Sequence, residues 1–468
     1  MFDWWDGVYK RIIAHVLATA FGLGTPMAFA KEASPVQEFM LENGLKLIVK
    51  EDRRAPVVVS QVWYKVGSGY EYSGITGISH MLEHMMFKGT DELAPGEFSR
   101  IIAAQGGTEN AFTSYDYTAY FQELEKSGLE VSFKLEADRM RDLRLSSDVL
   151  ALEKQVVMEE RRLRTDDDPQ SLTLEHFRAV AFKNSPYRNP VIGWMTDIEN
   201  YQINDLQSWY RQWYAPNNAV VVVVGDVDPA QVKALADKHF GKLAAVELDD
   251  IKPRREVSQF GPQRVTVSRP AKVPYLLLGY QAPSLATAEV GWEPYALIVL
   301  AAIFDGNEGS RFGKILRRGQ QLAAQLMVDY GLYDRKSTLF MIAGYPTPGT
   351  GVDALETAVL GEVARAQREL VTDEELDRIK IQVVAEDVYA RDSMFYQAMQ
   401  LGQLEAVGLG WQRRDEFVER VKAVTAEQVQ AVANKYLVEQ GLTVAVLEPK
   451  AMQDQEAASH NRKDPDVH

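Results

Sequence analysis

Two periodicities of hydrophobic residues divide this chain into segments that predict strands and segments that predict helices. Segments rich in β-branched residues, alternating or uniformly apolar, are typical of strands. They are residues 45–50, 57–64, 108–124, 220–224 and 275–280. Segments with apolar residues three and four positions apart are typical of helices. They are residues 78–87, 95–105, 131–163, 204–214, 292–304 and 373–390. Because both kinds of segment occur along the whole chain, the pattern predicts an α+β protein.

The order of these elements is repeated once. Residues 216–225 and 439–447 resemble each other, since each is an apolar segment that follows a helix ending in an aromatic-rich turn. This self-similarity predicts an internal duplication of an α+β unit of roughly 200 residues.

A charged, proline-containing stretch at 248–262 has no clear periodicity and is expected to link the two units. The predicted organisation is therefore an N-terminal metal-binding domain at 31–247 and a homologous C-terminal domain at 263–449. Residues 450–468 are polar and are expected to form a disordered tail.

Residues 1–30 have the pattern of an export signal. Lys10 and Arg11 precede the apolar run 12–30, which ends in Ala-Phe-Ala. Glycines and a proline inside the run make it a poor membrane span. We therefore expect a cleavable signal peptide and a mature protein in a bacterial periplasm. The alternative is an uncleaved N-terminal anchor. No other stretch of the sequence is long and apolar enough to span a bilayer.

Composition narrows the chemistry that the folded chain can perform. The net charge of −15 argues against a nucleic-acid partner, which would require a basic surface. The 468 residues include no cysteine, so disulfides, thiol nucleophiles and cysteine-bound metals are excluded. A metal ion would need nitrogen and oxygen ligands, and the chain contains seven histidines. Two histidines at helical spacing are therefore stronger evidence for a metal site than they would be in a histidine-rich chain.

His80 and His84 are four residues apart in the predicted helix 78–87. Residues i and i+4 lie on the same face of a helix, so the two imidazoles can bind one ion. Glu83 lies beside that face, where a carboxylate can act as general base toward a metal-bound water. The order His-x-x-Glu-His is the inverted form of a zinc-peptidase motif. The alternative is an amphipathic helix that exposes two histidines to solvent.

A third ligand could come from the glutamates of the predicted helical region 131–163. Glu153 and Glu160 are seven residues apart and lie on one face, whereas Glu159 points about 100° away. Two arginines follow directly, so the alternative is that these acids are solvated surface charges.

These residues resemble the pitrilysin/insulinase family of inverted-motif zinc peptidases, which includes the mitochondrial processing peptidases. The resemblance extends over about residues 36–449, and it is closest at 80–90, His-Met-Leu-Glu-His-Met-Met-Phe-Lys-Gly-Thr. In the family a distal glutamate follows the second histidine by a fixed spacing. Glu160 lies 76 residues after His84 and matches this glutamate, whereas Glu159 does not.

The resemblance implies a role for each of these side chains. His80, His84 and Glu160 would bind Zn²⁺, and Glu83 would activate the zinc-bound water. Glu153 matches a family glutamate that assists catalysis.

Residues 106–120 resemble the edge strand on which the family's substrates bind. There the substrate backbone pairs as an added strand, with Asn110 and Ala111 next to the scissile bond. Main-chain pairing recognises extended peptide with little regard to its sequence. Without the motif, an ordinary core strand would be the simpler interpretation.

The second half departs from the family pattern. In members that act as single chains, an arginine and a tyrosine of this half bind the substrate and stabilise the intermediate. Arg317 matches the arginine, but the tyrosine position is Ala324, and Tyr330 and Tyr333 lie too far along the chain. In two-subunit members a catalytically inactive sister chain supplies the pair. The resemblance therefore implies that this chain is the metal-bearing subunit of a heterodimer. The alternatives are a homodimer that functions without the hydroxyl, and a misalignment across one gap.

We therefore expect a zinc-dependent endopeptidase that hydrolyses extended peptides or unfolded segments. The resemblance implies two homologous α/β-roll domains, with antiparallel-rich sheets and helices packed on one face. The alternative is a non-catalytic scaffold or processing subunit of the same fold that binds peptide or a partner protein. Such chains typically lose a metal ligand, and the intact set of His80, His84 and Glu160 argues against that alternative.

Overall fold

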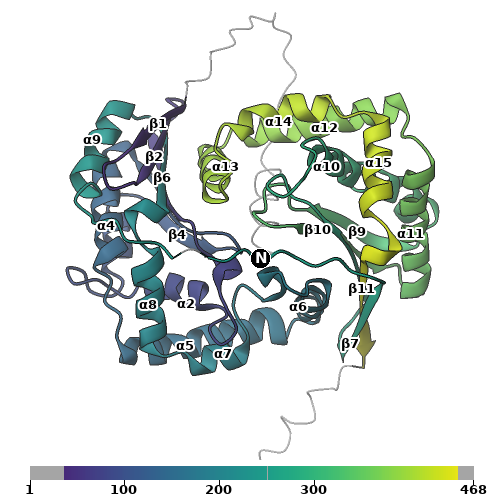
Figure 1. Ribbon diagram of the computed structural model, residues 1–468, viewed down its shortest axis with the longest axis horizontal. Coiled ribbons are helices and arrows are strands. Elements are labelled where there is room, and N and C mark those ends of the chain that lie inside the picture. Colours follow the sequence, from purple (N-terminus) through teal and green to yellow (C-terminus); the bar gives the residue numbers. More distant parts are fainter. Residues whose placement is uncertain (1–35, 250, 452–468) are drawn as a thin grey trace, which may run out of the picture. The chain divides into compact units, whose positions relative to one another are not determined.

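The computed structural model describes residues 36–249 and 251–451 of the chain (Figure 1). The expected signal peptide at 1–30 and most of the expected tail at 450–468 lie outside these residues. Within the described part, no helix combines the length and the apolar composition needed to cross a membrane. Residues 251–262, in the region expected to be a linker, form neither helix nor strand.

The first half of the chain contains a six-stranded mixed sheet in the order β1-β2-β6-β3-β5-β4. Its strands are β1 (Val36–Met40), β2 (Lys46–Glu51), β3 (Val57–Tyr64), β4 (Thr108–Thr113), β5 (Thr118–Glu125) and β6 (Ala219–Gly225). Strands β2 and β6 are parallel, and all other neighbours are antiparallel. Within residues 36–249 and 251–451, strand β4 pairs only with β5, so one side of its backbone forms an edge of the sheet.

The second half contains a five-stranded mixed sheet in the order β7-β11-β8-β10-β9. Its strands are β7 (Gln263–Pro270), β8 (Tyr275–Ala282), β9 (Ala323–Tyr330), β10 (Thr338–Pro346) and β11 (Leu442–Lys450). The pair β7 and β11 is parallel and the others are antiparallel. The strand order and the strand directions match those of β2-β6-β3-β5-β4 in the first sheet. Strand β9 takes the position of the edge strand β4. The predicted α+β fold with two homologous halves is confirmed.

Helices lie between the strands in both halves, with several in succession before β6 and before β11. Those of the first half are α2 (Ile78–Met85), α3 (Glu97–Ala104), α4 (Leu129–Arg141), α5 (Ser147–Arg161), α6 (Pro169–Ala181), α7 (Met195–Asn200), α8 (Ile203–Trp213) and α9 (Pro229–His239). Those of the second half are α10 (Glu293–Phe304), α11 (Val352–Arg368), α12 (Asp373–Ala390), α13 (Met394–Ala406), α14 (Arg413–Lys422) and α15 (Ala426–Tyr436). Two π-helical segments are η3 (Arg162–Asp166) and η6 (Phe312–Gly319).

The helical region predicted at 131–163 is two helices, α4 and α5. Ser146 separates them, because its side chain accepts a hydrogen bond from the Val149 backbone N–H and so starts a new helix. Serine is favoured at this position, where it satisfies an N–H group that has no partner inside the helix.

The two faces of the first sheet pack against helices from different halves. Val221 and Val223 belong to the hydrophobic core shared with helices of the same half, including α2, α4, α5 and α8. Val220 and Val222 point to the opposite face, where they pack with α13 from the second half. Successive side chains of a strand point to opposite faces, so a uniformly apolar strand such as β6 must be covered on both.

The second sheet receives a helix in return. Leu276 and Leu278 of β8 face the helices of their own half, while Leu277 packs with Phe177 of α6 from the first half. Each sheet thus carries its own helices on one face, as predicted, and one helix of the other half on the opposite face.

Gly402 allows the close packing of α13 on the first sheet. A Cβ at this position would come within 2.1 Å of the fully buried Trp63 indole. The indole of Trp63 therefore occupies the space that any larger residue at 402 would need.

Candidate metal centre

Helix α2 begins at a buried carboxylate. Glu71 accepts hydrogen bonds from the backbone N–H groups of Gly77 at 2.6 Å and Ser79 at 2.9 Å. Gly77 has a φ of 87°, and a Cβ there would meet the carbonyl oxygen of Ile192 at 2.3 Å, so glycine is required. Burial raises the pKa of Glu71 to about 7. These contacts fix where the helix begins and therefore where its side chains point.

The apolar residues of α2 face the core. Met81, Leu82 and Met85 are fully buried in the hydrophobic core of the first half. His80 and His84 lie on the other side of the helix, with their ring centroids 4.8 Å apart. The helical period predicted this arrangement from the sequence.

Glu160 of α5 completes a group of three potential metal ligands. One ligand atom from each of His80, His84 and Glu160 lies within 4.8 Å of the other two. The Nε2 atom of His84 is 3.2 Å from Oε2 of Glu160, and that of His80 is 3.9 Å from Oε1. Two imidazoles and one carboxylate are a donor set that suits zinc with an open fourth position.

The charges at this group also suit a cation. Burial would raise the pKa of Glu160, but the hydrogen bond with His84 and the charges of His80 and Arg164 lower it to about 2. Burial would lower the pKa of His84, but hydrogen bonds with Glu153 and Glu160 raise it to about 9. His80 Nδ1 is buried and makes no hydrogen bond among the described residues. The carboxylates thus stabilise positive charge at this position, and a divalent cation fits the group.

Glu153 contacts the metal group through His84. Its Oε1 lies 2.9 Å from Nδ1 of His84, and its Oε2 lies 2.7 Å from Nζ of Lys88. A carboxylate on one ring nitrogen leaves the other, Nε2, available to a metal. Lys88 was not singled out in the sequence, although it lies in the same motif segment as the histidines.

The neighbouring Glu159 is directed elsewhere. Its side chain is 59% exposed and pairs with Arg162 at 3.1 Å. Glu160 is 15% exposed and pairs with Arg164, in η3, at 2.7 Å. The structure therefore brings to the histidines the glutamate that the motif spacing selected.

Glu83 lies next to the three potential ligands and is partly buried. Burial raises its pKa to about 7. Its Oε2 accepts a hydrogen bond from the Thr113 hydroxyl at 2.5 Å. Thr113 is the last residue of β4 and was not predicted as a site residue, because no short motif connects it to Glu83.

Asn110 and Ala111 lie in the middle of the edge strand β4. The Asn110 side chain accepts a hydrogen bond from the Ala111 backbone N–H at 2.9 Å. The strand contacts α2, so its edge lies near the helix that carries the metal ligands.

The structure does not bring Arg317 into this group. Arg317 lies in η6 and pairs with Glu308 of its own half at 2.8 Å. Ala324 lies in β9 beside an open groove of about 650 Å³ that Pro274 and Tyr345 also line. The buried Tyr330 donates its hydroxyl hydrogen to the carbonyl of Pro283.

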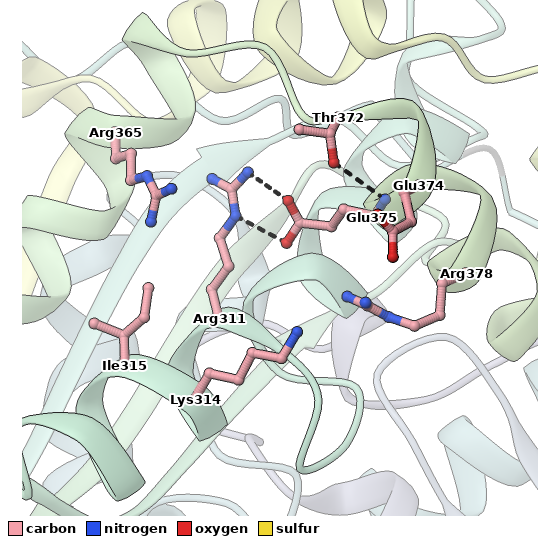
Figure 2. Close-up of a pocket in the computed structure, with 8 residues that line it drawn as sticks. All are labelled: Arg311, Lys314, Ile315, Arg365, Thr372, Glu374, Glu375 and Arg378. Carbon is pink, nitrogen blue, oxygen red and sulfur yellow. Dashed lines mark hydrogen bonds and ion pairs between the residues drawn. The ribbon is translucent and has the colours of Figure 1, made fainter.

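A second cavity, of about 300 Å³, lies between η6, α11 and α12 (Figure 2). Arg311 forms a bidentate ion pair with Glu375, at 3.1 and 2.9 Å. Arg365 lies on the side of Arg311 opposite Glu375 and pairs with Glu369 at 2.9 Å. The residues that line this cavity include no histidine, so it lacks the donor set of the metal centre.

Two family profiles match the chain. The one described as "Insulinase (Peptidase family M16)" matches residues 46–194, and "Peptidase M16 inactive domain" matches residues 200–383. The metal group lies entirely in the part that matches the first of them.

Curated and solved relatives are similar over most of the chain. "Zinc protease PqqE" of Helicobacter pylori is 32% identical over 377 residues, which are 80% of this chain and 84% of that protein. The crystal structure of a protease from Helicobacter pylori superposes with a TM-score of 0.84 at 30% identity, over 89% of this chain and 100% of that one. The periplasmic protease PqqL from Escherichia coli has the same fold, with a TM-score of 0.77 at 18% identity, over 92% of this chain and 51% of that one.

Proposed function

The chain belongs to the M16 insulinase family of zinc proteases, and from this premise we propose that it is an endopeptidase that cleaves extended peptides or unfolded segments. Zinc as the cofactor and proteolysis as the activity, both predicted from the sequence, are confirmed by the relatives together with the His-His-Glu group. In the proposal His80, His84 and Glu160 are the zinc ligands, and Glu83 is the general base.

The chemistry follows from the groups around Glu83. Zinc held by three protein ligands polarises a peptide carbonyl and a water molecule. Glu83 is partly buried beside the ligands, and its Oε2 accepts the hydrogen bond of Thr113. Its Oε1 is therefore the oxygen that accepts the proton from the attacking water and later delivers it to the leaving amine.

Two further groups support the site in this proposal. Glu153 holds the His84 ring through Nδ1 and so orients Nε2 toward the metal. The open edge of β4, at Asn110 and Ala111, would bind the substrate backbone as an added strand. Such pairing favours extended peptide over folded protein, because a folded segment has already used its backbone hydrogen bonds.

We further propose that a homologous subunit completes the site. Arg317 pairs with Glu308 instead of the metal group, and Ala324 carries no hydroxyl to stabilise an oxyanion. A sister chain that supplies an arginine and a tyrosine would provide both functions, and a homodimer is the alternative. We also propose a periplasmic location, supported by the export pattern of residues 1–30 and by the similarity in fold to PqqL, a periplasmic protease.

The observation that carries the proposal is the convergence of His80, His84 and Glu160 beside the partly buried Glu83. It also favours an active enzyme over a non-catalytic scaffold of the same fold. A scaffold would bind peptide without needing a complete ligand set and a base.

The test uses three glutamine variants. Glu83→Gln is expected to keep stoichiometric zinc and to lose at least about 100-fold in peptide hydrolysis. Glu160→Gln is expected to lose zinc, whereas Glu159→Gln, one residue away and exposed, should keep both zinc and activity. Full hydrolysis by the Glu83→Gln variant would refute the proposal. Zinc binding without turnover, restored by a co-purified homologous subunit, would support the heterodimer.

A further inference from the structure

Thr113 is placed by the fold to contact Glu83. It is 6% exposed, and its backbone pairs with Thr118 of β5 at the end of the strand pair β4–β5. Among the described residues, its hydroxyl makes the one hydrogen bond that the Glu83 carboxylate has.

The alternation of β4 explains why the hydroxyl points to α2. Ala111 packs against the hydrophobic core that contains α2. Phe112 packs on the opposite face, where its ring centroid lies 5.5 Å from that of Trp63. Thr113 is two residues after Ala111 and so shares its face. The strand that would bind the substrate backbone therefore also reaches the carboxylate that would act on the scissile bond.

The hydrogen bond distinguishes the two oxygens of the base. Thr113 donates to Oε2 of Glu83, which leaves Oε1 with free lone pairs. A carboxylate in a buried site that lacked this bond could rotate and present either oxygen at a changed distance. Small errors in the position of a catalytic group cost large factors in rate, because the reacting atoms must approach within a narrow range of geometry.

We propose that Thr113 is a positioning residue that fixes the Glu83 carboxylate in register with the substrate strand. The proposal rests on the proposed role of Glu83 as general base. The attacking water loses one proton to Oε1, while Thr113 keeps its own proton and donates a hydrogen bond to Oε2 throughout. Binding of a peptide along β4 and alignment of the base thus depend on the same strand, with the ligands His80 and His84 supplied by α2.

The test compares Thr113→Val, which keeps the shape but removes the hydroxyl, with Thr113→Ser, which keeps the hydroxyl. Steady-state peptide hydrolysis, zinc content and zinc affinity by chelator competition are measured for the full zinc-loaded protein, with any co-purifying subunit present. The valine variant is expected to lose about 10- to 100-fold in kcat with KM and zinc affinity unchanged. The serine variant is expected to regain activity to within about threefold of the wild type.

A matched control separates this role from a general disturbance of the strand pair. Thr118→Val removes a buried hydroxyl that donates to the carbonyl of Val66 and does not contact Glu83. It is expected to lower the melting temperature without the loss of kcat. Crystal structures of zinc-loaded wild type and Thr113→Val provide a readout that needs no turnover, in which the variant's Glu83 carboxylate should leave its wild-type position while the ligands stay.

Three results would overturn the inference. They are an unchanged kcat in Thr113→Val, a loss of kcat in Thr113→Ser as large as that in Thr113→Val, and a loss of activity explained by weaker zinc binding or a higher KM. Glu83→Gln is assayed in parallel. Activity in that variant would refute the proposed function itself. An inactive Glu83→Gln beside a fully active Thr113→Val would refute the role of Thr113 alone.

Discussion

Replacing Glu153 by alanine is expected to weaken zinc binding even though Glu153 is not itself a proposed ligand. Its carboxylate is 6% exposed and joins Nδ1 of His84 at 2.9 Å to the Lys88 ammonium at 2.7 Å. Removal frees the His84 ring to rotate and leaves Lys88 as an uncompensated positive charge near the metal. Both effects disfavour a bound cation.

The size of the effect follows from that geometry. Loss of a carboxylate that orients a metal-bound histidine typically costs about 10- to 100-fold in metal affinity. This range equals about 1.4 to 2.8 kcal/mol of binding free energy. We expect the upper part of the range, because Lys88 is 33% exposed and its charge is only partly screened by water.

Zinc affinity measured by competition with a chromogenic chelator tests this expectation, with Glu159→Ala as the exposed control on the same helix. A second variant, Glu153→Ala with Lys88→Met, should recover part of the affinity because it removes the unpaired charge. The reasoning would be refuted if Glu153→Ala bound zinc as tightly as the wild type. If zinc stayed bound while hydrolysis disappeared, Glu153 would act on the substrate rather than through His84.

The remaining predictions concern the metal, the packing of α13 and pH. Zinc should raise the melting temperature of the wild type in a concentration-dependent manner and leave that of Glu160→Gln unchanged, since a ligand stabilises only the form that binds it. Gly402→Ala should destabilise the fold by about 1–3 kcal/mol through the clash with Trp63. Gly441→Ala, where a Cβ meets nothing within 4 Å, is the control for denaturant unfolding. The raised pKa of Glu71, about 7 in the folded protein, means that its contribution to stability is complete below its ordinary pKa near 4.5 and is lost as the pH rises through 7. The melting temperature of Glu71→Gln relative to the wild type should therefore increase between pH 5 and pH 8, and a constant difference would contradict this.

The candidate metal ligands could be predicted from the sequence for two reasons. A spacing of four residues places His80 and His84 on one face of a helix wherever that helix lies, and the spacing of the resembled family selected Glu160 as the third candidate. Strands β2, β3, β6 and β8 were predicted equally well, since the alternation or uniform apolarity of a strand depends only on the residues within it. Strands β1, β7, β9 and β10 were not specified by the pattern. The boundary between α4 and α5 was missed, because one capping serine was outweighed by the helical period on either side.

The sequence by itself determined which elements form, that they repeat, and which residues of α2 and α5 are available to a metal. Only the tertiary structure decided that Thr113 contacts Glu83, that Lys88 shares Glu153 with His84, and that α6 and α13 each cover the sheet of the other half. The physical reason is the range of the interactions. Periodicity and capping act between residues a few positions apart, whereas a hydroxyl 30 residues from its partner carboxylate, or Gly402 against Trp63, depends on how sheets and helices stack.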